Sequence, residues 1–319
     1  MTGHIDDVVK SVAPSSVFLV ADRRVADLHG LPLDAPHLLL QAGEACKRIG
    51  VWRSILDALV EAGVDRDGLV VACGGGTVVD VAGFAAATYL RGVRWAAIAT
   101  TLIAQVDAAH GGKTGLDHTH GKNLIGAFHQ PVAVLTPPHV LQTLDPVAVR
   151  CGLAEIVKHG VIGRADLLDR CGRDDIATLV DDAKQVKLDI VARDPKEAGE
   201  RRLLNLGHTL GHAVEFASGY RLAHGDAVAV GLRAACRIAE QHTGFADRAR
   251  VEQTLDRCGL PRTARVEFDT AWTALGHDKK RRGKTLRWVL PHAVEDVRVH
   301  DDVPDDLVRT ALRTAVATL

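Results

Sequence analysis

The feature that most restricts the fold is an alternation of short β-branched segments with amphipathic segments through the first half of the chain. Runs of valine, isoleucine, leucine and alanine indicate strands at 16–20, 37–40, 69–72, 95–99 and 132–135. Between them, the apolar residues of 55–60 recur at helical spacing and give one apolar face. Strands that alternate with helices at this pitch predict a parallel sheet with helices on its faces.

The amino-acid composition of the sequence changes after the double proline at 137–138. From about residue 146 onward, segments rich in alanine, leucine, arginine and glutamate dominate, such as 228–240. A chain of 319 residues is long enough for two packed domains. We therefore expect an α/β domain with a parallel sheet over 1–145 and a mostly α-helical domain over 146–319.

Charge and cysteine usage exclude several classes of protein. A net charge of −1 gives no electrostatic field that would attract nucleic acid or an anionic membrane. The short basic run at 279–282 is expected to be solvated or to face a phosphate. The first ten residues are polar, and no apolar run approaches the roughly 20 residues that span a bilayer. The six cysteines form no C-x-x-C pair, which favours a reducing cytoplasm.

The glycine-rich turn in VVACGGGTVVDVAGF, residues 70–84, joins a predicted strand to a predicted helix. Glycines at such a turn let backbone N–H groups approach a pyrophosphate, and the helix N-terminus adds positive potential. The pattern is not G-x-G-x-x-G, so a plain tight turn explains it as well. Asp80, one turn into the helix, is either a solvated acid or an acceptor for a cofactor hydroxyl.

A second glycine-rich segment, 100–131, carries charged and polar residues among five glycines. These residues are Asp107, Lys113, Lys122 and Asn123. Glycine-rich loops that carry lysines are suited to bind phosphate or polyol oxygens at close backbone range. The alternative is a surface loop with solvated lysines, which would be costly to order without a ligand.

An acidic residue and several histidines in the helical half indicate a metal site. Glu155 and Lys158 are spaced i, i+3, so they share one helical face, and His208 and His212 are spaced i, i+4. His224 follows twelve residues later. One carboxylate and two or three histidines match a catalytic Zn²⁺ site that keeps an open coordination position.

Seven strings together resemble the 3-dehydroquinate synthase family, within the wider sugar phosphate cyclases. They are GGGTVVDVAGFAAATYLRG, TTLIAQVD, GGKTG, GKNLIGAF, GLAEIVKHG, LNLGHTLGHAVE and HGDAVAVG, and the similarity extends from residue 20 to residue 284. The resemblance implies a cytoplasmic, homodimeric lyase of the shikimate pathway of aromatic amino acid biosynthesis, using NAD and Zn²⁺ or Co²⁺. It implies conversion of a 3-deoxy-heptulosonate 7-phosphate to a carbocycle with loss of phosphate. NAD would oxidise a ring hydroxyl transiently, and elimination, re-reduction and an intramolecular aldol would follow.

The resemblance also implies that the α/β domain over 1–145 binds the nucleotide NAD and that the helical domain over 146–319 binds the metal and the substrate. It implies roles for individual residues as well. The zinc ligands would be Glu155, His208 and His224. The substrate would be a phosphorylated sugar acid, contacted by Asp107, Lys113, Lys122, Asn123, Lys158, Lys187, Arg201, Asn205, His212, Arg91, Lys279 and Lys280. Arg91 could reach the substrate from a partner subunit. Only one of Lys279 and Lys280 need face the substrate. NAD would be contacted by Asp22, Glu44, Lys47, Gly75, Gly76, Asp80, Thr100, Thr101 and Lys122.

Lys187 and Arg201 are the most informative pair for the substrate, because cyclases that act on sedoheptulose 7-phosphate or glucose 6-phosphate have no carboxylate to pair. Arg201 stands where a bidentate carboxylate clamp would, although an ordinary exposed arginine is the alternative. The pair favours a heptulosonate substrate. It leaves open the amino analogue used by aminodehydroquinate synthase, or another sugar phosphate cyclase of secondary metabolism.

A metal-dependent polyol dehydrogenase of the glycerol type is the alternative from a different class, and it would release NADH. Three departures from the family pattern bear on the substrate and the cofactor. His110 replaces a small or apolar residue, Asp117 replaces an asparagine after GGKTG, and Arg24 replaces an asparagine in the nucleotide-binding segment.

Overall fold

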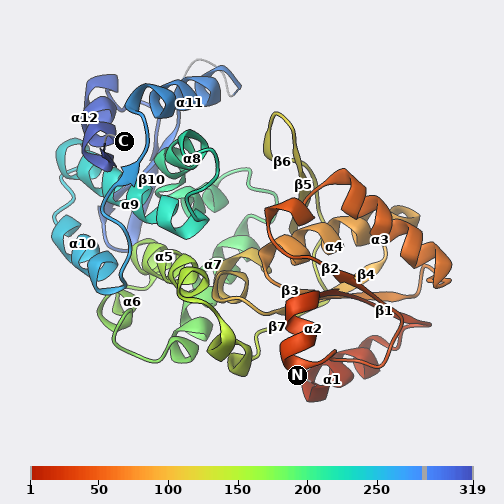
Figure 1. Cartoon of the computed structure of the whole chain (residues 1–319). Coiled ribbons are helices and arrows are strands. Elements are labelled where there is room, and N and C mark those ends of the chain that lie inside the picture. Colours follow the sequence, from red (N-terminus) through yellow and green to blue (C-terminus); the bar gives the residue numbers. More distant parts are fainter. Residues whose placement is uncertain (1, 282–285, 318–319) are drawn as a thin grey trace. The chain divides into compact units, whose positions relative to one another are not determined.

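The computed structural model describes residues 2–281 and 286–317, with side chains over 5–276 and 286–317 (Figure 1). The chain divides into two compact units, Met1–Leu144 and Asp145–Leu319. Each unit has its own secondary structure and is described by itself.

Unit 1 is built on a parallel sheet of five strands, in the order β2-β1-β3-β4-β7. The strands are β1 (Val17–Asp22), β2 (His37–Leu40), β3 (Leu69–Gly74), β4 (Arg94–Ala99) and β7 (Ala133–Leu135). The helices are α1 (Thr2–Val12), α2 (Arg23–His29), α3 (Ile49–Glu61) and α4 (Gly76–Thr88), with the short turns η1 (Glu44–Cys46), η2 (Tyr89–Arg91), η3 (Ala104–Ala108) and η4 (Pro138–Thr143). The predicted parallel α/β architecture is confirmed.

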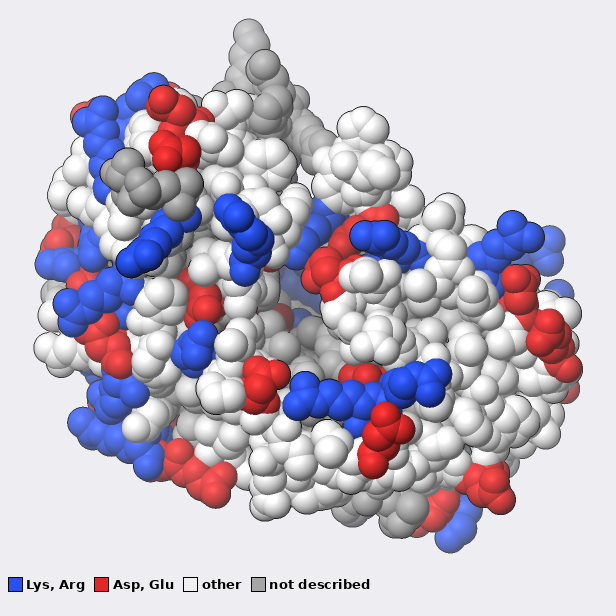
Figure 2. All heavy atoms as spheres, in the orientation of Figure 1, with Lys and Arg blue, Asp and Glu red and all other residues white. Residues whose placement is uncertain are grey.

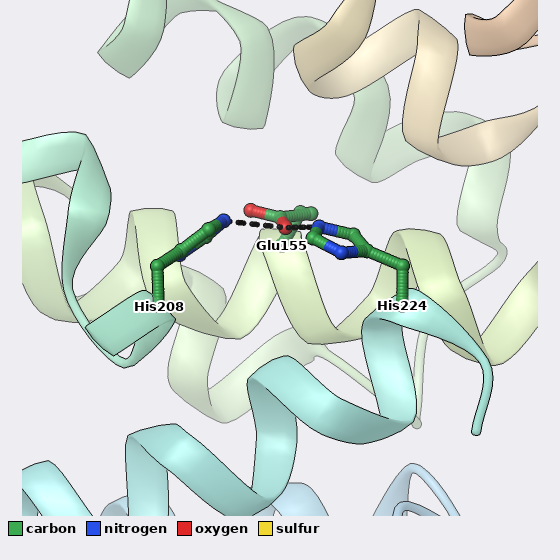
Figure 3. A group of neighbouring side chains, drawn as sticks. All are labelled: Glu155, His208 and His224. Atoms are coloured by element: carbon green, nitrogen blue, oxygen red, sulfur yellow. Dashed lines mark ion pairs between the residues drawn. The ribbon is translucent and has the colours of Figure 1, made fainter. Parts of the chain in front are cut away.

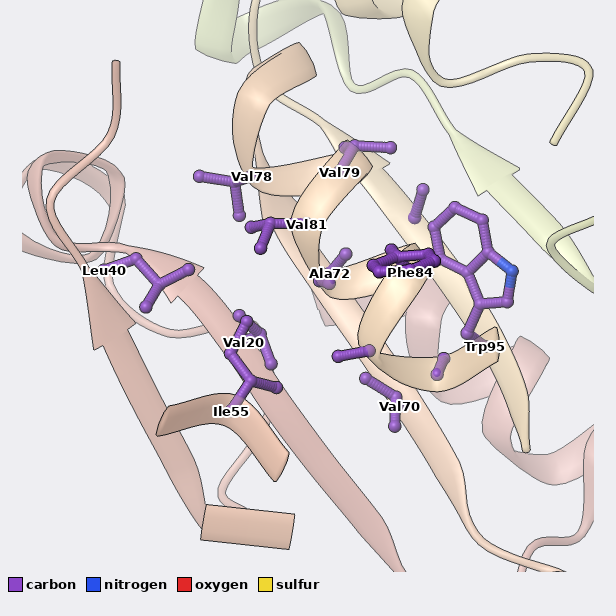
Figure 4. Close-up of a cluster of buried hydrophobic side chains, with 14 of the residues drawn as sticks. Val20, Leu40, Ile55, Val70, Ala72, Val78, Val79, Val81, Phe84 and Trp95 are labelled. Carbon is purple, nitrogen blue, oxygen red and sulfur yellow. The ribbon is translucent and has the colours of Figure 1, made fainter. Parts of the chain in front are cut away.

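The sheet of unit 1 is buried on both faces. Successive residues of a strand point to opposite faces, so each strand contributes to two apolar clusters. Val20 and Val70 belong to one apolar cluster, together with Ile55 of α3 and Val81 of α4 (Figure 4). The neighbouring strand residues, such as Leu19, belong to a second cluster on the other face. Burial on both faces explains why these strands are continuous apolar runs rather than alternating ones.

The glycine-rich segment 100–131 differs from the expected loop, because it forms the antiparallel hairpin β5 (Lys113–His118) and β6 (Gly121–Phe128). Gly115 of β5 pairs with Gly126 of β6, and a Cβ at Gly126 would lie 2.3 Å from the carbonyl oxygen of Thr114. Glycines at paired positions contribute no side chains, so the period-two signal of a strand is missing from the sequence.

Unit 2 is mostly helical, as predicted. Its helices are α5 (Pro146–Gly163), α6 (Asp166–Arg170), α7 (Val180–Arg193), α8 (His208–Ala217), α9 (His224–His242), α10 (Arg248–Arg257), α11 (Phe268–Arg281) and α12 (Asp305–Ala315), with the turns η5 (Ile176–Leu179) and η6 (Glu200–Asn205). Its short strands are β8 (Ala264–Arg265), β9 (Trp288–Ala293), β10 (Asp296–His300) and β11 (Val316–Ala317). Helix α9 is buried along most of its length and contacts α5, α8, α10, α12 and β9.

The surface of the chain carries both signs of charge. Lysine and arginine side chains are interspersed with aspartate and glutamate over the face shown in Figure 2. Within the residues that the structure describes, no helix combines the length and the apolar composition needed to cross a membrane.

Candidate functional site

Three side chains from separate helices of unit 2 converge on one point (Figure 3). Glu155 lies in the middle of α5, His208 begins α8 and His224 begins α9. The Oε1 atom of Glu155 lies 3.7 Å from Nε2 of His208 and 3.6 Å from Nε2 of His224. One ligand atom from each residue lies within 4.8 Å of the others, so the three can share one ion.

Two glycines allow the helices to bring these side chains together. Gly207 has φ +78°, a conformation that favours glycine, and it directs the chain into α8 immediately before His208. A Cβ at Gly225 would lie 2.2 Å from Cα of Cys151, so only glycine lets the first turn of α9 pack this closely against α5. Cys151 lies one turn before Glu155, and Gly225 follows His224.

The two histidines are held in orientations that direct Nε2 toward Glu155. The carbonyl oxygen of Leu206 lies 3.2 Å from Nδ1 of His208, and a carbonyl only accepts, so Nδ1 carries the proton and Nε2 keeps its lone pair. Burial and the nearby Lys158 lower the pKa of His208 to about 3, which keeps its ring neutral. Neutral imidazole is the form that binds a metal.

Glu215 is a residue that the sequence analysis missed. Its side chain is buried, and Oε2 lies 3.7 Å from Nδ1 of His224. Burial opposes protonation of His224, but the carboxylates of Glu155 and Glu215 outweigh it and raise the pKa of His224 to about 9. A metal-bound histidine is oriented by a carboxylate that accepts a hydrogen bond from the ring nitrogen that does not bind the metal. The spacing of seven residues from His208, which places Glu215 on the same helical face, could have identified it.

The donor set fits a zinc-type ion. Metal–ligand bonds of about 2.0–2.1 Å in a tetrahedron place neighbouring donor atoms about 3.3 Å apart, close to the separations seen between Glu155 and the two histidines. Lys158 forms an ion pair with Glu155, and both side chains are almost fully buried. Exposed His212 lies beside this set, with its ring centroid 5.3 Å from that of His208, and with Glu215 and His224 it forms an overlapping group of donors.

Three of the predicted carboxylate and phosphate contacts of unit 2 lie on two adjoining elements, Lys187 on α7 and Arg201 and Asn205 on η6. Lys187 of α7 is 7% exposed and Arg201 of η6 is 1% exposed, so the alternative of an ordinary exposed arginine is excluded. Nη1 of Arg201 donates to the carbonyl oxygen of Pro195 at 2.7 Å. Asn205, at the end of η6, donates through Nδ2 to Oε1 of Glu197 at 2.9 Å. The side chains of Lys279 and Lys280 lie outside the described residues.

In unit 1, five of the predicted cofactor and substrate residues join into ion pairs and hydrogen bonds. Nζ of Lys47 donates to Oδ2 of Asp80 at 2.7 Å and also to Oδ1 of Asn123. Lys122 forms an ion pair with Glu44 at 3.1 Å. The contacts link η1 and the loop after it to α4 and to β6, so residues far apart in the sequence form one charged network.

The remaining predicted residues of unit 1 lie mostly at the carboxyl ends of strands. Gly75 and Gly76 begin α4 directly after β3, and the backbone N–H of Thr100 donates to the carbonyl oxygen of Gly74 at 3.0 Å. Residues after parallel strands meet at one edge of the sheet, where ligands of such folds bind. The positions are Asp22 at the end of β1, Thr100 and Thr101 after β4, Asp107 within η3, and the exposed Arg91 and Lys113 in η2 and β5.

The three departures from the family pattern all take part in local contacts. His110 is buried, with Nε2 2.8 Å from the carbonyl oxygen of Gln105. Asp117 accepts a hydrogen bond of 2.8 Å from the backbone N–H of Asn123, which has a left-handed φ of +55°. The backbone N–H of Arg24 donates to Asp22 at the start of α2.

Nζ of Lys47 lies 2.7 Å from Oδ2 of Asp80 and 4.0 Å from Oδ1 of Asp117. Lys47→Met is therefore expected to destabilise unit 1, because it would leave both carboxylates without their shared cation. Breaking a largely buried pair from one side costs about 3 kcal/mol or more in the free energy of unfolding, which urea denaturation would measure. Arg48→Met, which removes an exposed charge from the next residue, is the control and should change little. Equal effects of the two substitutions would contradict a structural role for the Lys47 network.

Comparison with known families identifies both units. Residues 37–151 match the model described as 3-dehydroquinate synthase N-terminal, and residues 152–281 match the one described as 3-dehydroquinate synthase C-terminal. The 3-dehydroquinate synthase of Nostoc punctiforme is 41% identical over 309 residues, which cover 92% of this chain and 85% of that protein.

Solved structures of related cyclases share the fold. A 2-epi-5-epi-valiolone synthase from Streptomyces hygroscopicus subsp. jinggangensis, solved with NAD⁺ and Zn²⁺, matches with a TM-score of 0.88 and 29% identity, covering 99% of this chain and 95% of that one. A 2-deoxy-scyllo-inosose synthase, in complex with carbaglucose-6-phosphate, NAD⁺ and Co²⁺, matches with a TM-score of 0.85 and 25% identity, covering 98% and 95%.

Proposed function

Because the chain belongs to the 3-dehydroquinate synthase family, we propose that it is a carbon–oxygen lyase that converts a 3-deoxy-heptulosonate 7-phosphate into 3-dehydroquinate with loss of phosphate. The observation that carries this proposal is the convergence of Glu155, His208 and His224 from three helices of unit 2. We further propose that the protein works as a cytoplasmic homodimer in the shikimate pathway.

The three convergent side chains would hold Zn²⁺ or Co²⁺. When bound, the metal supplies Lewis acidity that lowers the pKa of a substrate hydroxyl, and NAD supplies a reversible hydride acceptor. Glu155 would bring one negative charge and the histidines, which lose any extra proton when they bind the metal, would bring none. The site would therefore keep net positive charge to stabilise a developing alkoxide. The buried ammonium of Lys158, next to Glu155, would donate a hydrogen bond to the same hydroxyl region.

In unit 2, Lys187 and Arg201 would bind the carboxylate of the substrate. Both cationic side chains are buried on adjoining elements, and a desolvated guanidinium favours a carboxylate partner. This burial supports a sugar acid as substrate over a neutral sugar. Asn205 and His212 would contact the phosphate, as would Lys279 or Lys280.

In unit 1, the charged network around Lys47 and the turn before α4 would bind NAD. The proposed contacts are Asp22, Glu44, Lys47, Gly75, Gly76, Asp80, Thr100, Thr101 and Lys122. The same unit would contribute Asp107 and Asn123 to substrate hydroxyls and Lys113 and Arg91 to the phosphate. Arg91 and Lys113 are exposed, which allows them to reach an anionic ligand.

A phosphate-release assay on four sugar phosphates tests the proposal. The substrates are 3-deoxy-D-arabino-heptulosonate 7-phosphate, its amino analogue, sedoheptulose 7-phosphate and glucose 6-phosphate. Release is expected with the first, without net reduction of NAD, because the cofactor is restored within the turnover. Preference for another of the four would reassign the substrate. Net NADH formation with glycerol, and no phosphate release, would support a polyol dehydrogenase instead.

Removal of the metal is expected to abolish phosphate release. The apoenzyme prepared with a chelator should be inactive, and Zn²⁺ or Co²⁺ should restore activity whereas Mg²⁺ should not, because two imidazole ligands favour the former ions. Activity and bound metal are measured on the same samples. Full activity in a protein verified to be free of metal would refute the metal assignment.

A further inference from the structure

A second group of histidines lies in unit 2, at the far end of α9. His242 is the last residue of α9, His300 is the last residue of β10, and Asp302 lies two residues beyond it. Oδ1 of Asp302 lies 3.3 Å from Nε2 of His242 and 3.6 Å from Nδ1 of His300. We propose that His242, His300 and Asp302 bind a divalent transition-metal ion, with His292 as a positioning residue.

The spacing of the donor atoms supports a shared ion. One atom from each of the three residues lies within 4.8 Å of the others, and the two distances from Asp302 are close to the edge of about 3.3 Å expected for tetrahedral zinc. Two imidazoles and one carboxylate favour Zn²⁺, Co²⁺, Ni²⁺ or Cu²⁺ over Mg²⁺ or Ca²⁺, which prefer oxygen ligands. Three protein ligands leave a coordination position for water.

His292 of β9 lies where it can hold His300 in the form that binds a metal. The rings of the two histidines are stacked, with centroids 5.1 Å apart, and their Nε2 atoms are 3.1 Å apart. One Nε2 therefore donates and the other accepts. When Nε2 of His300 donates to His292, Nδ1 of His300 keeps its lone pair and faces Asp302. A hydrogen bond to the second ring nitrogen of a metal-binding histidine typically contributes 10–100-fold to metal affinity.

The surroundings of the cluster favour a cation and allow it to enter. The C-terminal end of a helix carries partial negative charge, and His242 lies in the last turn of α9. The side chain of Asp302 is 71% exposed, and His242 also lines a surface pocket of about 320 Å³ together with Pro304 and Asp306. An ion can therefore reach the cluster from solvent.

This cluster is distinct from the candidate catalytic site. His224 and His242 are the first and last residues of α9, and a helix rises 1.5 Å per residue, so the two sites are about 27 Å apart along α9. An ion held by His242, His300 and Asp302 would tether the end of α9 to the hairpin β9–β10 and to the segment that leads into α12. The site would stabilise unit 2 and would take no part in the reaction.

Titration of the metal-free, full-length protein with Co²⁺ alone tests the proposal, with equilibrium dialysis for stoichiometry and visible absorption for coordination. Two Co²⁺ ions per chain are expected. Asp302→Asn should remove one of them, and Glu155→Gln should remove the other. Asp301→Asn is the matched control, because it removes the same charge from the neighbouring exposed position and should keep both ions.

Thermal unfolding gives a second readout that does not depend on cyclase activity. Zn²⁺ should raise the Tm of Glu155→Gln but not that of Glu155→Gln combined with Asp302→Asn, because only an ion that binds the folded state stabilises it. His292→Phe should weaken Co²⁺ binding about 10-fold or more, and His292→Gln, which keeps an acceptor, should weaken it less.

Two outcomes would overturn the proposal. One is a stoichiometry that is the same in Asp302→Asn and Asp301→Asn. The other is a Glu155→Gln variant that binds no Co²⁺ and gains no Tm from Zn²⁺. Asp302 is exposed, so its replacement by asparagine leaves the fold intact and the comparison stays decisive. Asp302→Asn should retain phosphate release, and a protein without cyclase activity could still bind the ion at His242, His300 and Asp302. The proposed function and the proposed second metal site can therefore be refuted independently of each other.

Discussion

Replacing Glu155 by glutamine is expected to lower kcat/KM for phosphate release by about 1,000-fold or more, equivalent to roughly 4 kcal/mol of transition-state stabilisation. Glutamine keeps the size of the side chain but removes the only negative charge among the three predicted ligands. The bound metal, measured by dialysis against Zn²⁺, should fall together with the activity. Unchanged activity in this variant would remove Glu155 from the site.

The same substitution should also destabilise unit 2, and this effect must be separated from catalysis. Lys158 forms an ion pair with Glu155, and the two side chains are 1% and 0% exposed. Removing one partner leaves a buried, uncompensated charge, which costs about 3–5 kcal/mol in the free energy of unfolding. The double variant Glu155→Gln with Lys158→Met removes both charges.

The double variant should recover most of the lost stability of the metal-free protein, because it leaves no unpaired charge at this position. It should not recover metal binding or phosphate release. Urea denaturation and the assay together distinguish the two roles. Recovery of activity along with stability would show that Glu155 acts through the fold alone.

Replacing Arg201 by alanine is expected to lower kcat/KM by about 30- to 5,000-fold for a substrate that carries a carboxylate, equivalent to about 2–5 kcal/mol. The guanidinium is buried, so an ion pair with the substrate would be desolvated, and its loss would leave the carboxylate with Lys187 alone. Arg201→Lys should recover only part of the loss, because an ammonium cannot form the same two parallel hydrogen bonds.

Two comparisons make the Arg201 prediction specific to the carboxylate. Arg202→Ala removes the same charge from the next residue, which is less buried, and should leave kcat/KM nearly unchanged. A slow reaction with sedoheptulose 7-phosphate, which lacks the carboxylate, should be insensitive to Arg201→Ala. Equal losses with both substrates would point to a structural effect of Arg201 rather than to recognition.

The parallel sheet of unit 1 could be predicted because its strands are buried on both faces and therefore appear as uninterrupted apolar runs. The hairpin β5–β6 could not, because Gly115 and Gly126 face each other and remove the alternation on which strand prediction depends. The network of Lys47, Asp80 and Asn123 depends on tertiary packing that spacing along the chain does not reveal.

The metal-binding residue types were evident from the sequence, since a carboxylate and histidines stand at helical spacing among glycines. Spacing alone left His212 as a candidate ligand, because His208 and His212 share a helical face. The structure directs Nε2 of His208 and of His224 toward Glu155, and it adds Glu215 behind His224.

The sequence by itself determined the alternation of sheet strands and helices in unit 1, the helical character of unit 2 and the residue types available for chemistry, because these depend on local periodicity and composition. Only the tertiary structure decided which of the histidines lie close enough to Glu155 to share an ion. That choice depends on how closely the helices pack, and at Gly225 the absence of a single Cβ brings α9 against α5. His242, His292 and His300 likewise come together only where α9 packs against β9, and no local pattern in the sequence indicates this.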